Sequence, residues 1–355
     1  MSWGMALLAG LLLAFLEKNW AGWALKKLRF TGSCDRVFAE PGEAVTWKAT
    51  VENTWRLPVP FVRVWESFPT AAKVKAEPGW VRSHCREAMR QWHVEERLSL
   101  LPRQRITRSV AMTFEKRGVY TLGGTRLSAG DLFGFNEETL DIPGQSIVVI
   151  PERSKKRIST QAVGGFLGDI SVRRFILEDP ILTIGFRDYT GREPMKAVSW
   201  TRTAVTGTMQ VKQYDHTAEQ TVQVLLNVEN GTPGALEEAF RLTRSVCEEL
   251  EKKKIPFGLR TNGNLPGPVG KLFHLSDGLG QSHLSTILYA LGRADYTCYQ
   301  SFRYLTTQTL RHRKSNEAYI VITPALREDG KACIRSLEQA VGSALCVLTA
   351  EEVEA

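Results

Sequence analysis

Apolar and polar residues alternate with a period of two through much of the first half of the chain, from Phe30 to Pro151. Between residues 45 and 51 every second side chain is apolar, and the alternation returns between residues 109 and 114. A strand with one face on a core and the other in water has this pattern. Turn residues such as Pro41 and Gly42 separate the segments, so residues 29–151 are predicted to form an antiparallel, immunoglobulin-like β-sandwich.

The period changes beyond residue 220. Thr221–Leu226 is a largely apolar run, typical of a strand buried on both faces, and residues 235–254 have the apolar spacing of an amphipathic helix. Further strands are predicted at 257–259, 319–322 and 344–348, and further helices at 284–291 and 334–341. This alternation predicts a doubly wound α/β domain with a mostly parallel sheet over residues 221–355, and hence an α+β chain of several domains.

The N-terminal 28 residues form a separate apolar segment. Residues 3–16 contain no charge, and a second apolar patch at residues 20–25 extends the run to the roughly 20 residues that a bilayer-crossing helix requires. Lys18, Lys26, Lys27 and Arg29 all follow the first run, which by the positive-inside rule places the rest of the chain in the cytoplasm. We expect residues 1–28 to be a single-pass anchor in the cell membrane; the alternative is a short apolar helix docked on the protein itself.

Basic residues and glycines connect the two predicted domains. A basic run from Arg153 to Arg157 follows the sandwich, and two glycines stand at positions 164 and 165. Residues 152–220 are therefore assigned as a basic linker together with a signature region. With Arg173 and Arg174, the basic run is either a binding strip for anionic lipid head groups or a solvated charged loop.

Composition narrows the function classes. The chain has 355 residues, is 43% hydrophobic and carries a formal net charge of +8, so it is long and apolar enough for two domains and suits an anionic partner. The basic residues are scattered and no nucleic-acid-binding motif occurs, which argues against nucleic acid. The six cysteines lie far apart without a Cys-x-x-Cys pair, so neither a zinc site nor a disulfide framework is indicated.

Two groups of residues invite a chemical interpretation. Cys247 with His283 or His274 would be a thiol dyad of a hydrolase, but Cys247 falls on the apolar stripe of its predicted helix, which favours core packing. Three tryptophans of the predicted sandwich are interpreted as core or rim packing in preference to a ligand cage: Trp47, Trp55 and Trp65. No catalytic residue is assigned, and no cofactor is expected.

The most distinctive stretch lies between Phe186 and Tyr214. It has a fixed order of motifs, namely Arg187-Asp188-Tyr189, Glu193, Trp200, Ala204, Gly207 and Val211-Lys212. Earlier in the chain stand Arg117-Gly118-Val119-Tyr120 and Asp131-Leu132-Phe133-Gly134. Together these motifs resemble the bacterial DUF58 family, and the resemblance covers nearly the whole chain. It implies a membrane-anchored protein whose C-terminal domain is similar to a von Willebrand factor A domain.

Some positions depart from the family pattern. Arg192-Glu193 stands where the family usually has Gly-Asp, and Val205 where it often has Arg. An A-type domain holds a divalent cation through Asp-x-Ser-x-Ser after its first strand, and the matching positions here are Asn227, Glu229 and Gly231. A later strand ends at Thr323 and Pro324 instead of an Asp-Gly loop. We therefore expect a degenerate crevice at Asn227, Glu229 and Thr323, without a metal.

The resemblance implies a non-enzymatic role as a membrane-tethered interaction or assembly factor that works with a MoxR-type AAA+ ATPase. The signature residues Arg187, Asp188, Tyr189, Glu193, Trp200 and Lys212 would then form the contact surface, with Arg192 and Lys196 adding charge. The alternative is structural: Arg187 and Glu193 pair, Trp200 packs under them, and the element fastens a hairpin. A scaffold that binds anionic lipid is a further alternative.

Overall fold

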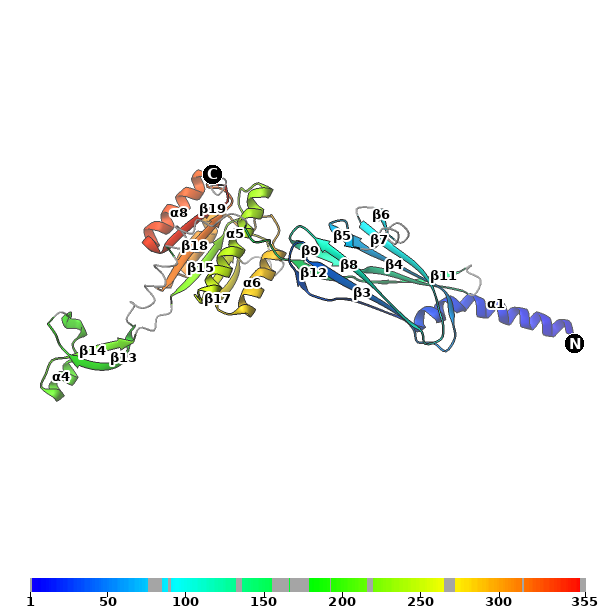
Figure 1. The fold of residues 1–355 in the computed structure, drawn as a ribbon, viewed down its shortest axis with the longest axis horizontal. Helices are drawn as coiled ribbons and strands as arrows, with labels where there is room; N and C mark the ends of the chain where they lie inside the picture. The colour runs from blue at the N-terminus through cyan, green and yellow to red at the C-terminus, as the bar shows by residue number, and fades with distance from the viewer. Residues whose placement is uncertain are drawn as a thin grey trace. The chain divides into compact units, whose positions relative to one another are not determined.

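A computed structural model describes residues 2–75, 85–88, 91–131, 136–154, 166, 179–191, 193–215, 220–264, 272–314 and 316–351. The chain divides into two compact units (Figure 1). The first comprises Met1–Glu152 with Leu291–Arg293, and the second comprises Arg153–Ala290 with Ala294–Ala355. The first consists mainly of antiparallel strands and the second of strands and helices, so the predicted α+β class is confirmed.

The first unit contains three sheets, with strand orders β1-β3-β8-β5, β11-β10-β4-β7-β6 and β2-β12-β9. Its strands are β1 (Leu28–Cys34), β2 (Phe38–Ala39), β3 (Ala44–Asn53), β4 (Val59–Pro69), β5 (Ala72–Lys75), β6 (Cys85–Ala88), β7 (Gln91–Leu100), β8 (Arg105–Phe114), β9 (Gly118–Leu122), β10 (Gly124–Gly130), β11 (Glu137–Ile142) and β12 (Gln145–Val149).

The period of two produces the sandwich core. In β3, Val45, Trp47, Ala49 and Val51 are buried while the residues between them are exposed or half-buried. Strand β3 pairs with β8 in antiparallel register, which places Trp47 opposite Val110. The predicted β-sandwich is therefore confirmed, because alternation directs one set of side chains inward from each sheet.

The N-terminal segment is one helix, α1 (Ser2–Lys27). Its last turns pack against the sandwich: Ala21 and Ala24 are buried, and the Trp20 ring lies 5.0 Å from the Trp55 ring, measured between centroids. Leu28, which begins β1, belongs to the same apolar cluster as Ala24. The second apolar patch of the segment is thus used in protein packing.

No helix in the described part of the chain combines the length and the apolar character needed to cross a bilayer. The prediction of a membrane-spanning helix over residues 1–28 included the apolar patch at residues 20–25 in the length of the span. Glu17 and Lys18 interrupt the run, and the patch contacts the sandwich. The uncharged stretch of residues 3–16 extends about 21 Å at 1.5 Å per residue, less than the roughly 30 Å of a bilayer core.

The second unit contains a two-stranded hairpin and a five-stranded sheet. In the hairpin, β13 (Asp179–Asp188) pairs with β14 (Gln210–Asp215), and between them lie the 3-10 turn η1 (Met195–Ala197) and helix α4 (Trp200–Thr206). The sheet has the order β17-β16-β15-β18-β19, and β17 alone runs antiparallel to its neighbour. Its strands are β15 (Thr221–Leu226), β16 (Phe257–Thr261), β17 (Phe273–Gly278), β18 (Glu317–Thr323) and β19 (Leu345–Thr349).

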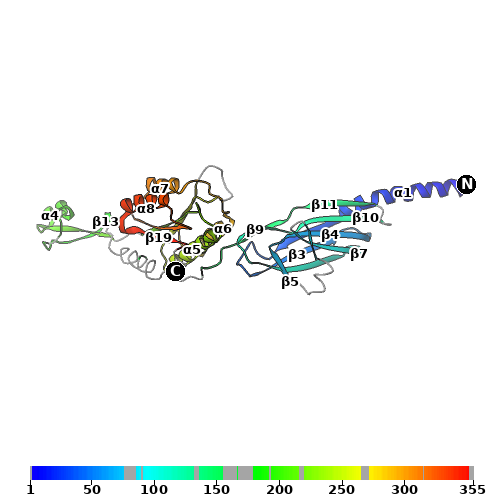
Figure 2. The ribbon, with the colours of Figure 1, turned by 90° about the horizontal axis from the view of Figure 1, so that it is seen from above.

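Helices cover both faces of this sheet (Figure 2). Helices α7 and α8 lie on one face, where Leu225 of β15 packs with Leu305 and Leu337, and α5 and α6 lie on the other. The helices are α5 (Pro233–Lys252), α6 (Gln281–Arg293), α7 (Phe302–Arg311) and α8 (Glu328–Val341), followed by the 3-10 turn η2 (Gly342–Ala344). The predicted α/β arrangement is thus present, with α7 and β17 as additional elements.

Candidate functional site

The predicted crevice lies where β15 and β18 end. Asn227 directly follows β15, and Thr323 is the last residue of β18. The Asn227 amide donates to the Thr323 hydroxyl at 3.0 Å, and its oxygen accepts from the Asn262 amide at 2.8 Å and from the Glu229 backbone N–H at 3.0 Å. The parallel register thus brings the predicted residues Asn227 and Thr323 together, and Asn227 is buried.

Glu229 has a structural partner in the crevice. Its carboxylate accepts a 2.6 Å hydrogen bond from the backbone N–H of Phe302, the first residue of α7. A carboxylate at this position satisfies an otherwise unpaired N–H and interacts favourably with the helix dipole. Glu229 therefore helps to hold the start of α7. The crevice itself is a cavity of about 300 Å³, lined among others by Arg303, Arg327 and Asp329.

The crevice residues do not fit a divalent cation held by an A-type motif. Hard cations take several oxygen ligands, whereas the Asn227 amide oxygen already accepts two hydrogen bonds and the Glu229 carboxylate accepts one from the start of α7. A side chain at Gly231 would bring its Cβ within 2.6 Å of Pro324, so the last serine of the motif has no room. No group of three or more His, Cys, Asp or Glu side chains suited to a metal occurs among the described residues.

The signature region is the hairpin of residues 179–215, which we call the signature hairpin. Arg187 donates from Nη1 to Glu193 Oε1 at 2.7 Å, and Glu193 also accepts from the Thr190 backbone N–H at 3.0 Å and from the Thr190 hydroxyl at 2.7 Å. The Thr190 hydrogen bond and then that of Arg187 lower the pKa of Glu193 to about 2. This carboxylate therefore holds the turn together by pairing with Arg187.

The other signature residues lie around this ion pair. Asp188 lies opposite Gln210 and accepts a hydrogen bond from its amide, and the Tyr189 backbone N–H donates to Met209. Gly207 ends α4 at a positive φ of 71°, which suits glycine because it has no Cβ. Lys212 is exposed, and Arg192 lies outside the described residues.

Trp200 does not pack under the Arg187–Glu193 pair as the structural alternative expected. Its side chain is 60% exposed, and three further apolar side chains of the hairpin are also exposed: Phe186, Met195 and Val205. The Arg202 guanidinium lies 5.1 Å from the centroid of the Phe186 ring. The hairpin thus presents apolar side chains next to cationic ones, a composition common in protein interfaces.

A second cavity, of about 840 Å³, was not expected from the sequence. We call it the basic cavity, and residues of β15, β16, β17 and α7 and of the segment after α7 line it: Gln223, Arg260, Leu272, Phe273, His274, Ser276, Asp277, Tyr304, Gln308, His312, Arg313 and Lys314. It shares no lining residue with the crevice.

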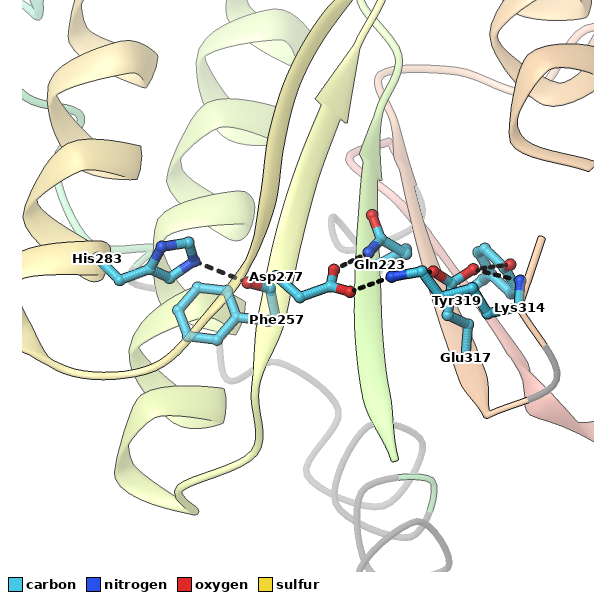
Figure 3. Close-up of polar contacts among 7 residues, drawn as sticks. All are labelled: Gln223, Phe257, Asp277, His283, Lys314, Glu317 and Tyr319. Carbon is cyan, nitrogen blue, oxygen red and sulfur yellow. Dashed lines mark hydrogen bonds and ion pairs between the residues drawn. The ribbon is translucent and has the colours of Figure 1, made fainter. Parts of the chain in front are cut away.

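A chain of polar contacts includes three residues that line one wall of the basic cavity, Gln223, Asp277 and Lys314, and continues to Glu317 and Tyr319 behind them (Figure 3). Buried Gln223 donates its amide to Asp277, and the Lys314 ammonium group donates to the other Asp277 oxygen at 3.0 Å. Lys314 also lies 3.7 Å from buried Glu317, which accepts a 2.6 Å hydrogen bond from the Tyr319 hydroxyl. The Asp277 contacts raise the pKa of Lys314, so this lysine stays charged.

The proposed thiol dyad finds no support in the geometry. Cys247 is fully buried in α5, and burial raises the pKa of its thiol well above the ordinary value. A thiol held in its protonated form is a poor nucleophile. His283 bonds instead to the Phe257 carbonyl oxygen at 2.7 Å (Figure 3), and burial followed by Arg260 lowers the pKa of His274.

Two other sequence interpretations concern packing and the linker. Trp47 is buried, Trp55 packs against Trp20, and Trp65 stacks on His93 with ring centroids 4.3 Å apart, in line with core and rim roles. In the basic linker, Arg153 pairs with Glu248 at 2.8 Å. Residues 155–157 of the linker, together with Arg173 and Arg174, lie outside the described residues.

Comparison with known proteins identifies no family for the chain. No family model and no curated protein matches it. The solved structures similar to part of it include a non-cellulosomal cohesin from Archaeoglobus fulgidus, with 14% identity and a TM-score of 0.25 over 34% of this chain and 91% of the cohesin. A PapD-like domain of human CEP192 has 16% identity and a TM-score of 0.21 over 35% of this chain and 85% of that domain. Likeness at this level carries no argument about function.

Proposed function

We propose that the chain is a non-enzymatic protein-interaction factor and that the signature hairpin is its contact surface. The exposure of Trp200 carries the proposal, because large aromatic side chains tend to be covered in a free protein and are enriched at the centres of interfaces. The paired Arg187 and Glu193 would hold the turn in a fixed conformation, so that little ordering cost arises when a partner binds.

The partner we propose is a MoxR-type AAA+ ATPase, on the basis of the resemblance to the DUF58 family. The finer fold assignment, an immunoglobulin-like sandwich followed by a von Willebrand factor A-like domain, belongs to the same proposal. It is supported by the order β17-β16-β15-β18-β19, in which the first strand of the sheet is central and has parallel neighbours on both sides. This order creates a topological switch point at the carboxyl end of β15.

Binding of the full chain to a purified MoxR-type AAA+ ATPase of the same organism tests this proposal. The change Trp200→Ala should weaken binding by about 2 kcal/mol or more, the loss typical of an interface hot spot, and should leave the fold intact. Phe61→Ala is the matched control, since it removes an exposed aromatic side chain from the first unit. Equal binding by the Trp200→Ala variant and the unaltered chain would refute the contact surface.

A second candidate role is attachment to an anionic membrane surface through α1. Leu8 and Phe15 are 70% and 58% exposed, and the sequence of residues 3–16 contains no charged side chain. A helix of this kind is normally covered by protein or lipid. Co-sedimentation with phosphatidylserine vesicles tests the attachment: deletion of residues 1–16 should abolish it, and retention by the shortened chain would contradict it.

A further inference from the structure

Arg260 is a cationic side chain of the basic cavity that has no anionic partner among the described residues. It belongs to β16 and lines the basic cavity, where its neighbours include His274 and Lys314. Within the described part of the chain no ion pair joins it to a carboxylate, and its half-buried side chain leaves Nε without a hydrogen-bond acceptor. A guanidinium group that is partly removed from water is stabilised by an acceptor, so this position lacks a partner that a ligand could supply.

The charges around the basic cavity are unbalanced. Three lining residues are cations at neutral pH, Arg260, Arg313 and Lys314, and Asp277 is the one acidic residue in the lining. Asp277 is already neutralised by Lys314 at 3.0 Å and also accepts from Gln223. Buried Glu317, the other carboxylate in this chain of contacts, lies 3.7 Å from Lys314, and no ion pair joins it to Arg260 within the described residues. Neither carboxylate therefore pairs with Arg260.

The wall of the cavity is fixed in position. Gln223 is 1% exposed, and its amide oxygen has no hydrogen-bond partner although its amide nitrogen is bonded to Asp277. Gly258 gives these two side chains room, because a Cβ there would lie 2.9 Å from the Asp277 carboxylate and 3.0 Å from the Gln223 amide. The absence of a side chain at Gly258 thus lets the Gln223 and Asp277 side chains meet in the wall.

We propose that the basic cavity binds a small organic anion, whose carboxylate or phosphate oxygens pair with the guanidinium group of Arg260. Arginine presents parallel N–H donors that match two oxygens of such a group. Tyr304 and Gln308 of α7 supply further polar groups, while Leu272 and Phe273 offer an apolar wall for the body of the ligand. The cavity volume of about 840 Å³ lies in the range of small-molecule sites.

Isothermal titration calorimetry of the full chain tests the proposal. Sodium succinate and sodium phosphate are titrated separately at pH 7, with sodium chloride at matched ionic strength as the blank. Saturable binding of one of them is expected, and Arg260→Gln should weaken it at least ~10-fold. Succinate binding identifies a carboxylate ligand and phosphate binding a phosphorylated one. Binding of neither probe, or unchanged affinity in Arg260→Gln, would overturn the proposal.

Two variants control for site and for folding. Arg303→Gln removes a cation from the crevice, which shares no lining residue with the basic cavity, and should bind the probe as the unaltered chain does. An equal loss in Arg303→Gln would show a nonspecific effect of charge and overturn the site. Arg260→Lys serves if Arg260→Gln does not fold: it keeps the charge but loses the planar fork, so several-fold weaker binding is expected and unchanged affinity counts against the proposal.

Discussion

Trp47 donates a 2.7 Å hydrogen bond from its indole N–H to the carboxylate of Glu66 and so connects the two main sheets of the sandwich. Trp47 belongs to β3 and Glu66 to β4, and both side chains are buried. Arg108 of β8 pairs with Glu66 and also lies 2.8 Å from Glu96. Burial lowers the pKa of Arg108 to about 10, yet it remains charged at neutral pH.

Glu66→Ala should destabilise the sandwich by about 3–5 kcal/mol, because it leaves a buried guanidinium group and a buried indole N–H without this acceptor. Urea unfolding followed by tryptophan fluorescence measures the effect, because eight of the nine tryptophans lie within residues 1–152 and Trp200 is the exception. Glu52→Ala is the control, because its partner Arg105 is exposed and the expected loss is below ~1 kcal/mol. Similar losses in both variants would contradict a dominant role for the buried carboxylate.

The Arg187–Glu193 pair should persist in acid. The folded-state pKa of Glu193, about 2, is below its ordinary value of 4.5, so its contribution to stability is complete above pH 4.5 and is lost as the pH falls toward 2. A pH titration of the Glu193 side-chain carbonyl by NMR measures this directly. Arg187→Gln should move the midpoint upward, and a midpoint near 4.5 in the unaltered chain would be inconsistent with the pair.

Gly231→Ser should destabilise the second unit by about 1–3 kcal/mol. The added Cβ would lie 2.6 Å from the Pro324 side chain and 2.8 Å from that of Leu236, so the neighbouring groups must shift. Gly234→Ser is a matched control, because a Cβ at that position meets nothing within 4 Å. Thermal unfolding followed by far-ultraviolet circular dichroism compares them, and equal melting temperatures would show that the crevice can open.

The cysteines should differ widely in reactivity. Cys298 is exposed, whereas Cys247 is fully buried, and burial raises the pKa of both thiols but far more that of Cys247. Alkylation of the folded chain at pH 8 should therefore label Cys298 at least ~100-fold faster than Cys247, as judged by mass spectrometry of the peptides. Denaturation in urea should remove the difference. Rapid labelling of Cys247 in the folded chain would reopen the interpretation of that residue as a nucleophile.

Hydrophobic periodicity was sufficient to predict the sandwich class, with β3 and β8 as its clearest strands, and most strands and helices of the five-stranded sheet and its faces. It missed α7, because Thr306, Thr307 and Thr309 give this segment a low helix propensity. Its start is stabilised instead by the Ser301 side chain and, from far away in the sequence, by Glu229. Contacts of this kind cannot be read from local sequence.

The candidate sites were predictable to different degrees. Two contacts could be predicted from the sequence. Arg187 pairs with Glu193 across a short turn, and Asn227 meets Thr323 because parallel strands end at the same edge of the sheet. The polar wall of the basic cavity depends on the antiparallel register of β17, which places Gly278 opposite Phe257 and so brings Asp277 to Gln223. Nothing in the local sequence around Asp277 specifies that register.

Helix α7 contributes residues to both the crevice and the basic cavity, which share no lining residue. Ser301, Phe302 and Arg303 at its start line the crevice, and Tyr304 and Gln308 farther along line the basic cavity. A rigid helix moves as one body, so any occupant that displaces α7 on one side reshapes the other. By thermodynamic linkage such an influence runs equally in both directions, so an occupant of the crevice and an occupant of the basic cavity would affect each other's binding through α7.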